Sequence, residues 1–452
     1  MAQTLDTAFL KASPDQHARL AIGAVAIVDG AVPHYEVLKS LLAERIQSIP
    51  RCTQLLRAHP SNQEWIDYPE FDLTHHVRRM AIARPGDETE LSRAIAHACE
   101  RPLDLDRPPW ECWVIEGLKG NRWAILMKTH HRLADGNSAA HLLTRLCDDA
   151  DSDIFANHTE AKRVSPQAQE RSWVDALWRA SSLAGTVTST LAGTICPAMR
   201  TTPIGPVTTL RRYSTVRVAI ADVDSVCRKF GVTANDVALA AVTEGFRTAL
   251  LGRGEEPRAD SLRTLVPMAV RSAMLPYLPV EHDDPVQRLR TVHNRCKAKQ
   301  TDQPQPSGIV EAAINSLPTM LRDSVIQLLS RLPQRGIVTL ATNVPGPRHR
   351  LRLMGQTMER LLPIPPTAVQ LSTGVAILSY GDELVFGITA EYDAAFDVKQ
   401  LAAGIELGMA RLVALSQDSV LLFGKDHRRR RSRGVSGRVP RAHPPAPEQV
   451  PH

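Results

Sequence analysis

The stretch Trp123-Ala-Ile-Leu-Met-Lys-Thr-His-His-Arg-Leu-Ala-Asp-Gly136 decides the fold of this chain. Its first part, Trp123 to Met127, is a continuous apolar run of the kind that a buried strand shows. Asn137 and Ser138 are common helix N-cap residues, and leucines follow them at helical spacing: Leu142, Leu143 and Leu146. The stretch therefore predicts a strand, a tight turn and a helix, with two histidines where the strand ends.

The two histidines occupy adjacent positions, 130 and 131. Neighbouring side chains of a strand point to opposite faces, so the two imidazoles cannot enter the same cavity. One of them can act as a base, because a neutral imidazole titrates near working pH. The other is expected to pack or to hydrogen-bond behind it.

The pattern His-His-x-x-x-Asp-Gly resembles the active-site motif of acyltransferases built like chloramphenicol acetyltransferase and of the condensation domains of peptide synthetases. Further segments narrow the resemblance to bacterial wax ester synthase/diacylglycerol acyltransferases, of the actinobacterial triacylglycerol synthase type, because they occur in the order seen there. These segments are Pro102-Leu-Asp-Leu-Asp-Arg-Pro-Pro-Trp110-Glu111, Gly231-Val-Thr-Ala-Asn-Asp236, Val266-Pro267 with Arg271, and Asn343-Val-Pro-Gly-Pro347. The resemblance spans roughly residues 1 to 423.

The resemblance implies an α/β fold of two chloramphenicol-acetyltransferase-like halves, whose mixed sheets face a central channel. A chain of 452 residues is also too long for one ordinary core. We therefore predict an N-terminal acyltransferase subdomain over residues 1–149, a linker or crossover segment over 150–212, a C-terminal acyltransferase subdomain over 213–423 and a basic tail over 424–452.

The same resemblance implies an O-acyltransferase that moves a fatty acyl group from acyl-CoA to diacylglycerol or to a long-chain alcohol. Such a transfer needs a base for the attacking hydroxyl and a site that excludes water. In the family the second histidine of the motif is the base, which assigns that role to His131, with His130 beside it. Gly136 lets the backbone turn sharply without a Cβ.

Asp135 of the motif has two interpretations, a second acid/base or a structural charge. In the resembling enzymes this aspartate is structural and pairs with an arginine of the first domain. The matching segment here is Ile49-Pro-Arg51, so Arg51 is the expected partner. A buried carboxylate needs such a partner, because an unpaired buried charge is very costly.

No prosthetic group or metal is expected, and acyl-CoA enters as a co-substrate. A histidine base needs no covalent intermediate, and the sequence has no Gly-x-Ser-x-Gly elbow. No Gly-rich phosphate loop marks a coenzyme A site, so the sequence names no residue that binds it. The seven cysteines are scattered without Cys-x-x-Cys spacing, which predicts neither a zinc site nor a disulfide framework.

Asn235 and Asp236 open a predicted helix of the second half. Thr233 stands three residues before Asp236, and this spacing has the form of a capping box, which explains both side chains without catalysis. The family carries this Asn-Asp pair as a second signature near the site, which is the functional alternative.

The second half also contains a predicted rigid turn and a predicted hairpin. Asn343, Pro345 and Gly346 belong to a turn after the strand-like run 336–342, and the resemblance suggests that this turn lines the acyl channel. The runs 371–380 and 384–392 are typical of two strands, and Gly381-Asp382 joins them.

The chain departs from the family pattern after Arg271. After Val266-Pro-Met-Ala-Val-Arg271 the relatives carry a short insert that this chain lacks, which concerns one wall of the substrate channel.

His75-His76 is a second histidine pair, but no Asp-Gly follows it, so we interpret it as a strand segment without a catalytic role.

Charge is concentrated in the tail. Residues 424–452 carry eight basic and two acidic residues, which leaves 46 of each in the rest of the chain. A neutral body argues against a nucleic-acid partner. The tail is either a solvated, disordered extension, which its composition favours, or a contact with anionic lipid.

The sequence shows neither a signal peptide nor an apolar run long enough to span a bilayer. The segment 173–199 is either a helix packed on the protein or a helix lying in a membrane interface. We expect a cytoplasmic monomer or homodimer that associates peripherally with the inner membrane or with lipid droplets. Two alternative functions stay open: a related acyltransferase acting on a polyketide or glycolipid alcohol, and a non-catalytic lipid-binding homologue.

Overall fold

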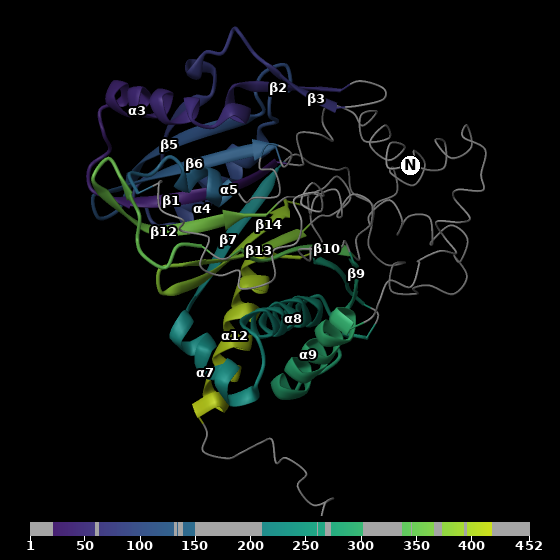
Figure 1. Ribbon diagram of the computed structural model, residues 1–452. Helices are drawn as coiled ribbons and strands as arrows, with labels where there is room; N and C mark the ends of the chain where they lie inside the picture. The colour runs from purple at the N-terminus through teal and green to yellow at the C-terminus, as the bar shows by residue number, and fades with distance from the viewer. Residues whose placement is uncertain are drawn as a thin grey trace, which may run out of the picture. The chain divides into compact units, whose positions relative to one another are not determined.

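Two six-stranded mixed sheets organise the protein (Figure 1). The computed structural model describes residues 21–58, 63–130, 133, 139–149, 210–259, 261–266, 273–301, 337–344, 346–365, 373–392 and 396–417. All of these except Gln417 belong to one compact unit. The predicted linker 150–212, the segment 173–199 and the tail 424–452 lie almost entirely outside the described residues, so the predicted domain limits stay predictions.

The first sheet has the strand order β11-β12-β1-β6-β5-β4. Its strands are Arg352–Leu353 (β11), Gln356–Ile364 (β12), Ala21–Asp29 (β1), Arg122–His130 (β6), Trp110–Leu118 (β5) and Val77–Ala81 (β4). Only β4 and β5 are parallel, and the other neighbours are antiparallel. A small ribbon of Gln54–Ala58 (β2) and Gln63–Asp67 (β3) is separate from it.

The second sheet has the order β7-β14-β13-β10-β8-β9. Its strands are Arg211–Ala219 (β7), Glu383–Glu391 (β14), Thr373–Tyr380 (β13), Ile337–Val344 (β10), Arg263–Val266 (β8) and Ala273–Tyr277 (β9). β10 is parallel to both β8 and β13, whereas the remaining pairs are antiparallel. The prediction of two α/β halves with mixed sheets is therefore confirmed, and so is the hairpin that turns at Gly381 and Asp382.

Helices cover both sheets. The α-helices are Tyr35–Gln47 (α3), Glu88–Glu100 (α4), Ala139–Thr144 (α5), Ile220–Phe230 (α7), Ala234–Gly252 (α8), Pro285–Thr301 (α9) and Val398–Gln417 (α12), and the 3₁₀ turns are Pro50–Thr53 (η1) and Leu73–His75 (η2). Helices α8 and α12 cross closely because Gly245 faces Gly404, and a Cβ on either glycine would meet the other helix.

The two halves of the chain are interwoven, because β11 and β12 come from the C-terminal half and join the first sheet beside β1. Gly387 of β14 lets β12 pass closely, since a Cβ there would overlap the carbonyl of Pro363. The Tyr213 hydroxyl of β7 donates to the same carbonyl at 2.9 Å. Through β12, which pairs with β1 and contacts β14 and β7, the two sheets are therefore coupled.

Asp148 holds the turn between β11 and β12. Its carboxylate accepts bonds from the Gly355 and Met354 amides at 2.7 and 3.2 Å, and from Arg45 of α3 at 2.6 Å. Burial alone would raise the pKa of Asp148, but these hydrogen bonds and the arginine outweigh it and lower the pKa. Asp148, which lies just after α5, thus holds the β11–β12 hairpin in place.

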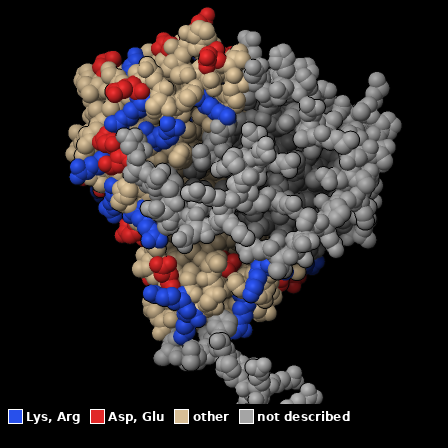
Figure 2. All heavy atoms as spheres, viewed as in Figure 1, with Lys and Arg blue, Asp and Glu red and all other residues tan. Residues whose placement is uncertain are grey.

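Alternate residues of β6 supply two cores. Ile125 and Met127 belong to a cluster with α3 and α5, whereas Ala124 and Leu126 belong to a cluster with α4. Such alternation is expected of a strand buried on both faces, and it confirms the strand predicted from Trp123 to Met127. On the outside, Figure 2 shows basic and acidic side chains interspersed over the described part of this face.

Candidate active site

The first histidine of the motif is a buried strand residue. His130 ends β6, where it pairs with Ala21 of β1, and its amide donates to the carbonyl of Pro109 at 2.9 Å. Its side chain shares a strand face with Lys128 by alternation, and the residue is only 2% exposed. The structure therefore places His130 inside the protein, at the point where the chain leaves the sheet.

The other catalytic candidates, His131, Asp135 and Gly136, lie outside the described residues. Their predicted roles stay predictions, as does the capping role of Asn137 and Ser138. Within this segment, Leu133 is described and is buried in the cluster that contains Met127.

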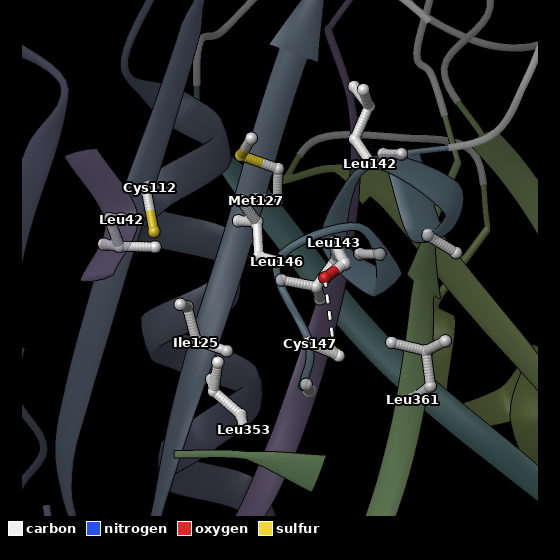
Figure 3. Close-up of a cluster of buried hydrophobic side chains, with 14 of the residues drawn as sticks. Leu42, Cys112, Ile125, Met127, Leu142, Leu143, Leu146, Cys147, Leu353 and Leu361 are labelled. Carbon is white, nitrogen blue, oxygen red and sulfur yellow. Dashed lines mark hydrogen bonds between the residues drawn. The ribbon is translucent and has the colours of Figure 1, made fainter. Parts of the chain in front are cut away.

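The motif segment is anchored at both of its ends. Before it, β6 is buried from Trp123 to His130, and after it α5 begins at Ala139. Figure 3 shows the leucines that follow the motif beside Ile125 and Met127 of β6, in one apolar cluster: Leu142, Leu143 and Leu146. Both elements that flank the motif segment in the sequence therefore belong to the core.

Arg51, the predicted partner of Asp135, lies in η1. Its guanidinium stacks over the Trp65 ring, 5.0 Å from the centroid. The next residue, Cys52, is buried, and its carbonyl accepts a hydrogen bond from the Trp110 indole at 2.8 Å. Arg51 thus stands on a turn that is fixed to the start of β5, while its pairing with Asp135 stays a prediction.

Trp110 connects the two histidine pairs of the chain. Its ring stacks on His76 with centroids 4.5 Å apart, and its carbonyl accepts a hydrogen bond from His76 Nδ1 at 2.8 Å. The carbonyl of the preceding residue, Pro109, receives the amide of His130. The Pro-Pro-Trp segment therefore touches both pairs.

The interpretation of His75-His76 as a strand segment is wrong. His75 ends the 3₁₀ turn η2, His76 follows that turn, and β4 begins only at Val77. Asp72 caps the turn, since its carboxylate accepts from the Thr74 amide at 2.8 Å. This Asx-type cap bends the chain where its β-prone neighbours would otherwise extend it.

A buried ionic network lies behind β5 and β6, and the sequence did not predict it. Glu111 of β5 accepts from the Trp113 indole at 3.1 Å and pairs with Lys128 at 3.1 Å and Arg78 at 3.0 Å. Lys128 is almost fully buried and also donates to two carbonyl oxygens, those of Ala98 and Arg101. Burial lowers the pKa of Lys128, which Glu111 partly opposes. The only sign of this network in the sequence is one charged residue near an end of each apolar strand, Glu111 in β5 and Lys128 in β6.

A polar cavity of about 360 Å³ opens beside this network. Its lining comes from η2 and β4, from the loop after α4 and from the start of β5: Thr74, His75, His76, Arg78, Arg101, Pro102, Asp104, Arg107, Pro108, Trp110 and Glu111. Pro108 and Trp110 flank the residue that binds the His130 amide. The cavity therefore adjoins the end of β6 from which the motif starts.

Comparison with known proteins supplies the family. Residues 3–238 match the wax ester synthase/diacylglycerol acyltransferase catalytic domain, and residues 271–412 match the C-terminal domain of the same enzymes. The chain belongs to the wax ester synthase/diacylglycerol acyltransferase family. The resemblance inferred from the motifs is confirmed, and the protein is an acyltransferase.

Relatives of this family cover nearly the whole chain. A putative diacylglycerol O-acyltransferase of Mycobacterium tuberculosis is 62% identical over 99% of this chain and 99% of its own length. The probable diacylglycerol O-acyltransferase tgs1 of the same species is 47% identical, covering 92% of this chain and 96% of its own.

Two solved structures share the fold. The wax ester synthase/diacylglycerol acyltransferase of Marinobacter aquaeolei is 22% identical, with a TM-score of 0.64, and the match covers 91% of this chain and 98% of the other. The starter condensation domain of rhizomide synthetase, solved with C8-CoA, is 14% identical, with a TM-score of 0.51, and the match covers 89% and 91%. These likenesses confirm the predicted fold class.

The Asn-Asp signature of the family caps a helix in this member. The Thr233 hydroxyl accepts from the Asp236 amide, and the Asp236 carboxylate accepts from the Thr233 amide, which forms the predicted capping box. Asp236 is buried and also pairs with His293 of α9 at 2.8 Å. The structure thus gives Asp236 a role in joining α8 to α9, while Asn235 is half-buried beside it.

The family's Asn-Val-Pro-Gly-Pro segment begins inside a strand. Asn343 and Val344 are the last residues of β10, so the prediction that Asn343 belongs to the turn is wrong. Pro345 lies outside the described residues. Gly346 donates its amide to the Ser379 hydroxyl at 3.1 Å, and it packs against the Ser379 carbonyl where a Cβ would clash. Its role in lining a channel stays a prediction.

The place where the sequence predicts a missing insert lies between two paired strands. Val266 of β8 lies opposite Ala273 of β9, so the chain between them connects antiparallel neighbours, and Arg271 lies outside the described residues. In the part of the chain that the structure describes, no cluster of His, Cys, Asp and Glu has the geometry of a metal site. The same residues include no helix long and apolar enough to cross a membrane.

Proposed function

We propose that this protein transfers a fatty acyl group from acyl-CoA to the free hydroxyl of diacylglycerol, forming triacylglycerol, and that long-chain alcohols are alternative acceptors. The observation that carries the proposal is the motif at the end of buried β6, in a chain whose relatives are named diacylglycerol O-acyltransferases. The anchoring of β6 and α5 supports it, because a base must be held still to act efficiently.

In the proposed mechanism His131 is the general base. Its neutral imidazole takes the proton of the acceptor hydroxyl while the oxygen attacks the thioester carbonyl. The tetrahedral intermediate then collapses, the carbon–sulfur bond breaks and the imidazolium returns the proton to the leaving thiolate of CoA. His130, buried beside it, positions this end of β6, and no covalent enzyme intermediate, metal or prosthetic group takes part.

The test is an assay of the full chain with acyl-CoA and diacylglycerol, which follows free CoA and triacylglycerol together. We expect both products in equal amounts, and the same rate after treatment with a chelator. Free CoA without acylated acceptor would mean hydrolysis. Acylation only of a polyketide or glycolipid alcohol, or tight lipid binding without CoA release, would favour one of the two alternative functions.

We also propose that the enzyme works at a lipid surface, at the inner membrane or a lipid droplet, and that its tail contributes to binding there. Diacylglycerol and long-chain alcohols are insoluble in water, and the five arginines at 428–431 and 433 would each contribute about 1 kcal/mol near an anionic surface before screening. Deleting residues 424–452 should weaken binding to anionic liposomes at low salt, with turnover on detergent-dispersed substrate retained. Equal liposome binding by the shortened chain would make the tail only a solvated extension.

A further inference from the structure

The cavity beside the end of β6 is lined by three arginines, Arg78, Arg101 and Arg107. They come from two separate parts of the chain: Arg78 lies in β4, and the other two lie at either end of the loop that follows α4. The fold therefore gathers guanidinium groups at one opening, where no single sequence motif would have shown them.

The acidic groups at this cavity do not balance the basic ones. Glu111 is one buried carboxylate, and it lies near three cations: Arg78 at 3.0 Å, Lys128 at 3.1 Å and Arg101 at 3.5 Å. Arg107 pairs with Asp104 at 3.4 Å, and Asp72 lies 4.0 Å from His75. Glu111 and its three cationic neighbours together therefore carry a formal charge of +2.

Two of the guanidinium groups remain open to solvent. The Arg101 side chain is 54% exposed and the Arg107 side chain is 35% exposed, although both line the cavity. Each has five N–H donors, and a single ion pair longer than 3.3 Å occupies few of them. Such groups suit a ligand with several anionic oxygens, because guanidinium matches phosphate geometry.

The position of the cavity ties it to the proposed reaction. The loop from Arg101 to Trp110 forms one of its walls, and the Pro109 carbonyl in that loop holds the His130 amide at 2.9 Å. A ligand whose anionic end is held here would lie beside the strand that leads to His131. The polar, charged lining does not suit an acyl chain, which would lose its apolar contacts there.

We propose that this arginine-lined cavity binds an organic phosphate, which the proposed function supplies as the phosphorylated nucleotide end of acyl-CoA. The inference rests on that function for the identity of the donor, and on the structure for the site. Arg101 and Arg107 bind the phosphate oxygens, and Arg78 completes the positive lining from β4. The phosphate of an anionic lipid headgroup has the same chemistry and is the alternative source.

The test measures binding directly, without turnover. The full chain is titrated with coenzyme A, with 3′,5′-ADP and with pantetheine, which lacks phosphate, and separately with vesicles containing phosphatidate. The variant R101A/R107A should bind coenzyme A and 3′,5′-ADP at least tenfold more weakly, with no comparable change for pantetheine. R101K/R107K should keep part of the affinity, because charge remains but bidentate binding is lost.

A matched control is R258A. Arg258 has a side chain that is 59% exposed and pairs with Glu256, so it resembles Arg101 in exposure but lies on the loop after α8. It should leave coenzyme A binding unchanged. Thermal unfolding of R101A/R107A should stay close to that of the unmodified protein, because Glu111 keeps its pairs with Arg78 and Lys128 and the Arg107–Asp104 pair is exposed to solvent.

Each outcome decides the inference. Unchanged coenzyme A affinity in R101A/R107A overturns it. Loss of binding to phosphatidate vesicles with coenzyme A affinity retained assigns the cavity to a lipid headgroup and overturns the donor assignment. If no acyl transfer to any acceptor is found, the proposed function fails, but the binding titration still decides the site. If transfer occurs, the preference for acyl-CoA over acyl-pantetheine in kcat/KM should fall in R101A/R107A and stay constant in R258A.

Discussion

The two histidine pairs of this chain have the same dipeptide sequence and different surroundings. His130 ends β6, which is buried from Trp123 to His130, and α5 later returns the chain to the same core. His75-His76 ends a 3₁₀ turn before the edge strand β4. Both pairs contact the Pro109-Trp110 segment, so their difference lies in which group makes the contact.

The contact of His76 is made by its ring, whereas that of His130 is made by its backbone. A carbonyl oxygen can only accept, so Nδ1 of His76 carries the proton, and the ring is further held between Phe71 and Trp110. An imidazole fixed in this way serves packing. The backbone contact of His130 instead fixes the course of the chain where β6 ends.

The largest expected effect separates the pairs by activity. His131→Ala should lower turnover by about 10²–10⁴-fold, because a general base contributes that much, while the protein stays folded. His130→Ala should reduce kcat less and stability more. His76→Ala should leave turnover per folded molecule within the range of the unmodified enzyme. Near-normal turnover by the His131 variant would reverse the assignment of the base.

The next effect tests whether the first pair depends on Asp135 and its predicted partner Arg51, which have no counterpart after the second pair. Asp135→Ala and Arg51→Ala should each lower the free energy of unfolding by about 3–5 kcal/mol, because either change leaves a charge without its partner. The double variant should lose much less than the sum of the two. Additive losses in urea unfolding would show that the two residues do not interact.

A smaller effect concerns the two members of the second pair. His76→Ala should lower the free energy of unfolding by about 2–3 kcal/mol, since it removes two ring contacts and a buried hydrogen bond. His75→Ala is the control and should change it by less than about 0.5 kcal/mol, because the side chain is half exposed. Equal losses from the two changes would contradict the packing role of His76.

Local signals predicted the elements that depend on neighbouring residues. The apolar run 123–127 became β6, the runs around Gly381 became a hairpin, and Thr233 with Asp236 formed a capping box. In each case the interacting residues lie within a few positions of one another, or in strands joined by a tight turn. The sequence alone was therefore sufficient.

The sequence did not predict the pairing of residues that lie far apart in the chain. The joining of β12 to β1 depends on residues more than 300 positions apart, and no local pattern encodes it. No residue close to Lys128 in the sequence explains its burial, and only the contact with Glu111 of the neighbouring strand shows why a lysine is buried there. The gathering of Arg78 with Arg101 and Arg107 has the same origin.

The smallest effect is a difference in acid sensitivity between the two members of the second pair, His76 and His75. Burial lowers the pKa of His76 below its ordinary value of 6.5; the hydrogen bond to the Trp110 carbonyl opposes this, while Arg107 and His75 add to it. Above pH 6.5 the ring is neutral in both states. As the pH falls below that value the unfolded chain binds the proton first, so the free energy of unfolding decreases until the folded ring is protonated too.

His76→Gln should therefore flatten the decline in urea midpoint as the pH falls below about 6.5, whereas His75→Gln should not. Each profile is compared with that of the unmodified protein under the same conditions, so contributions from other groups cancel. The glutamine can still donate to the Trp110 carbonyl, which separates the loss of titration from the loss of the hydrogen bond. Parallel profiles for the His76 variant and the unmodified protein would mean that His76 does not titrate differently on folding.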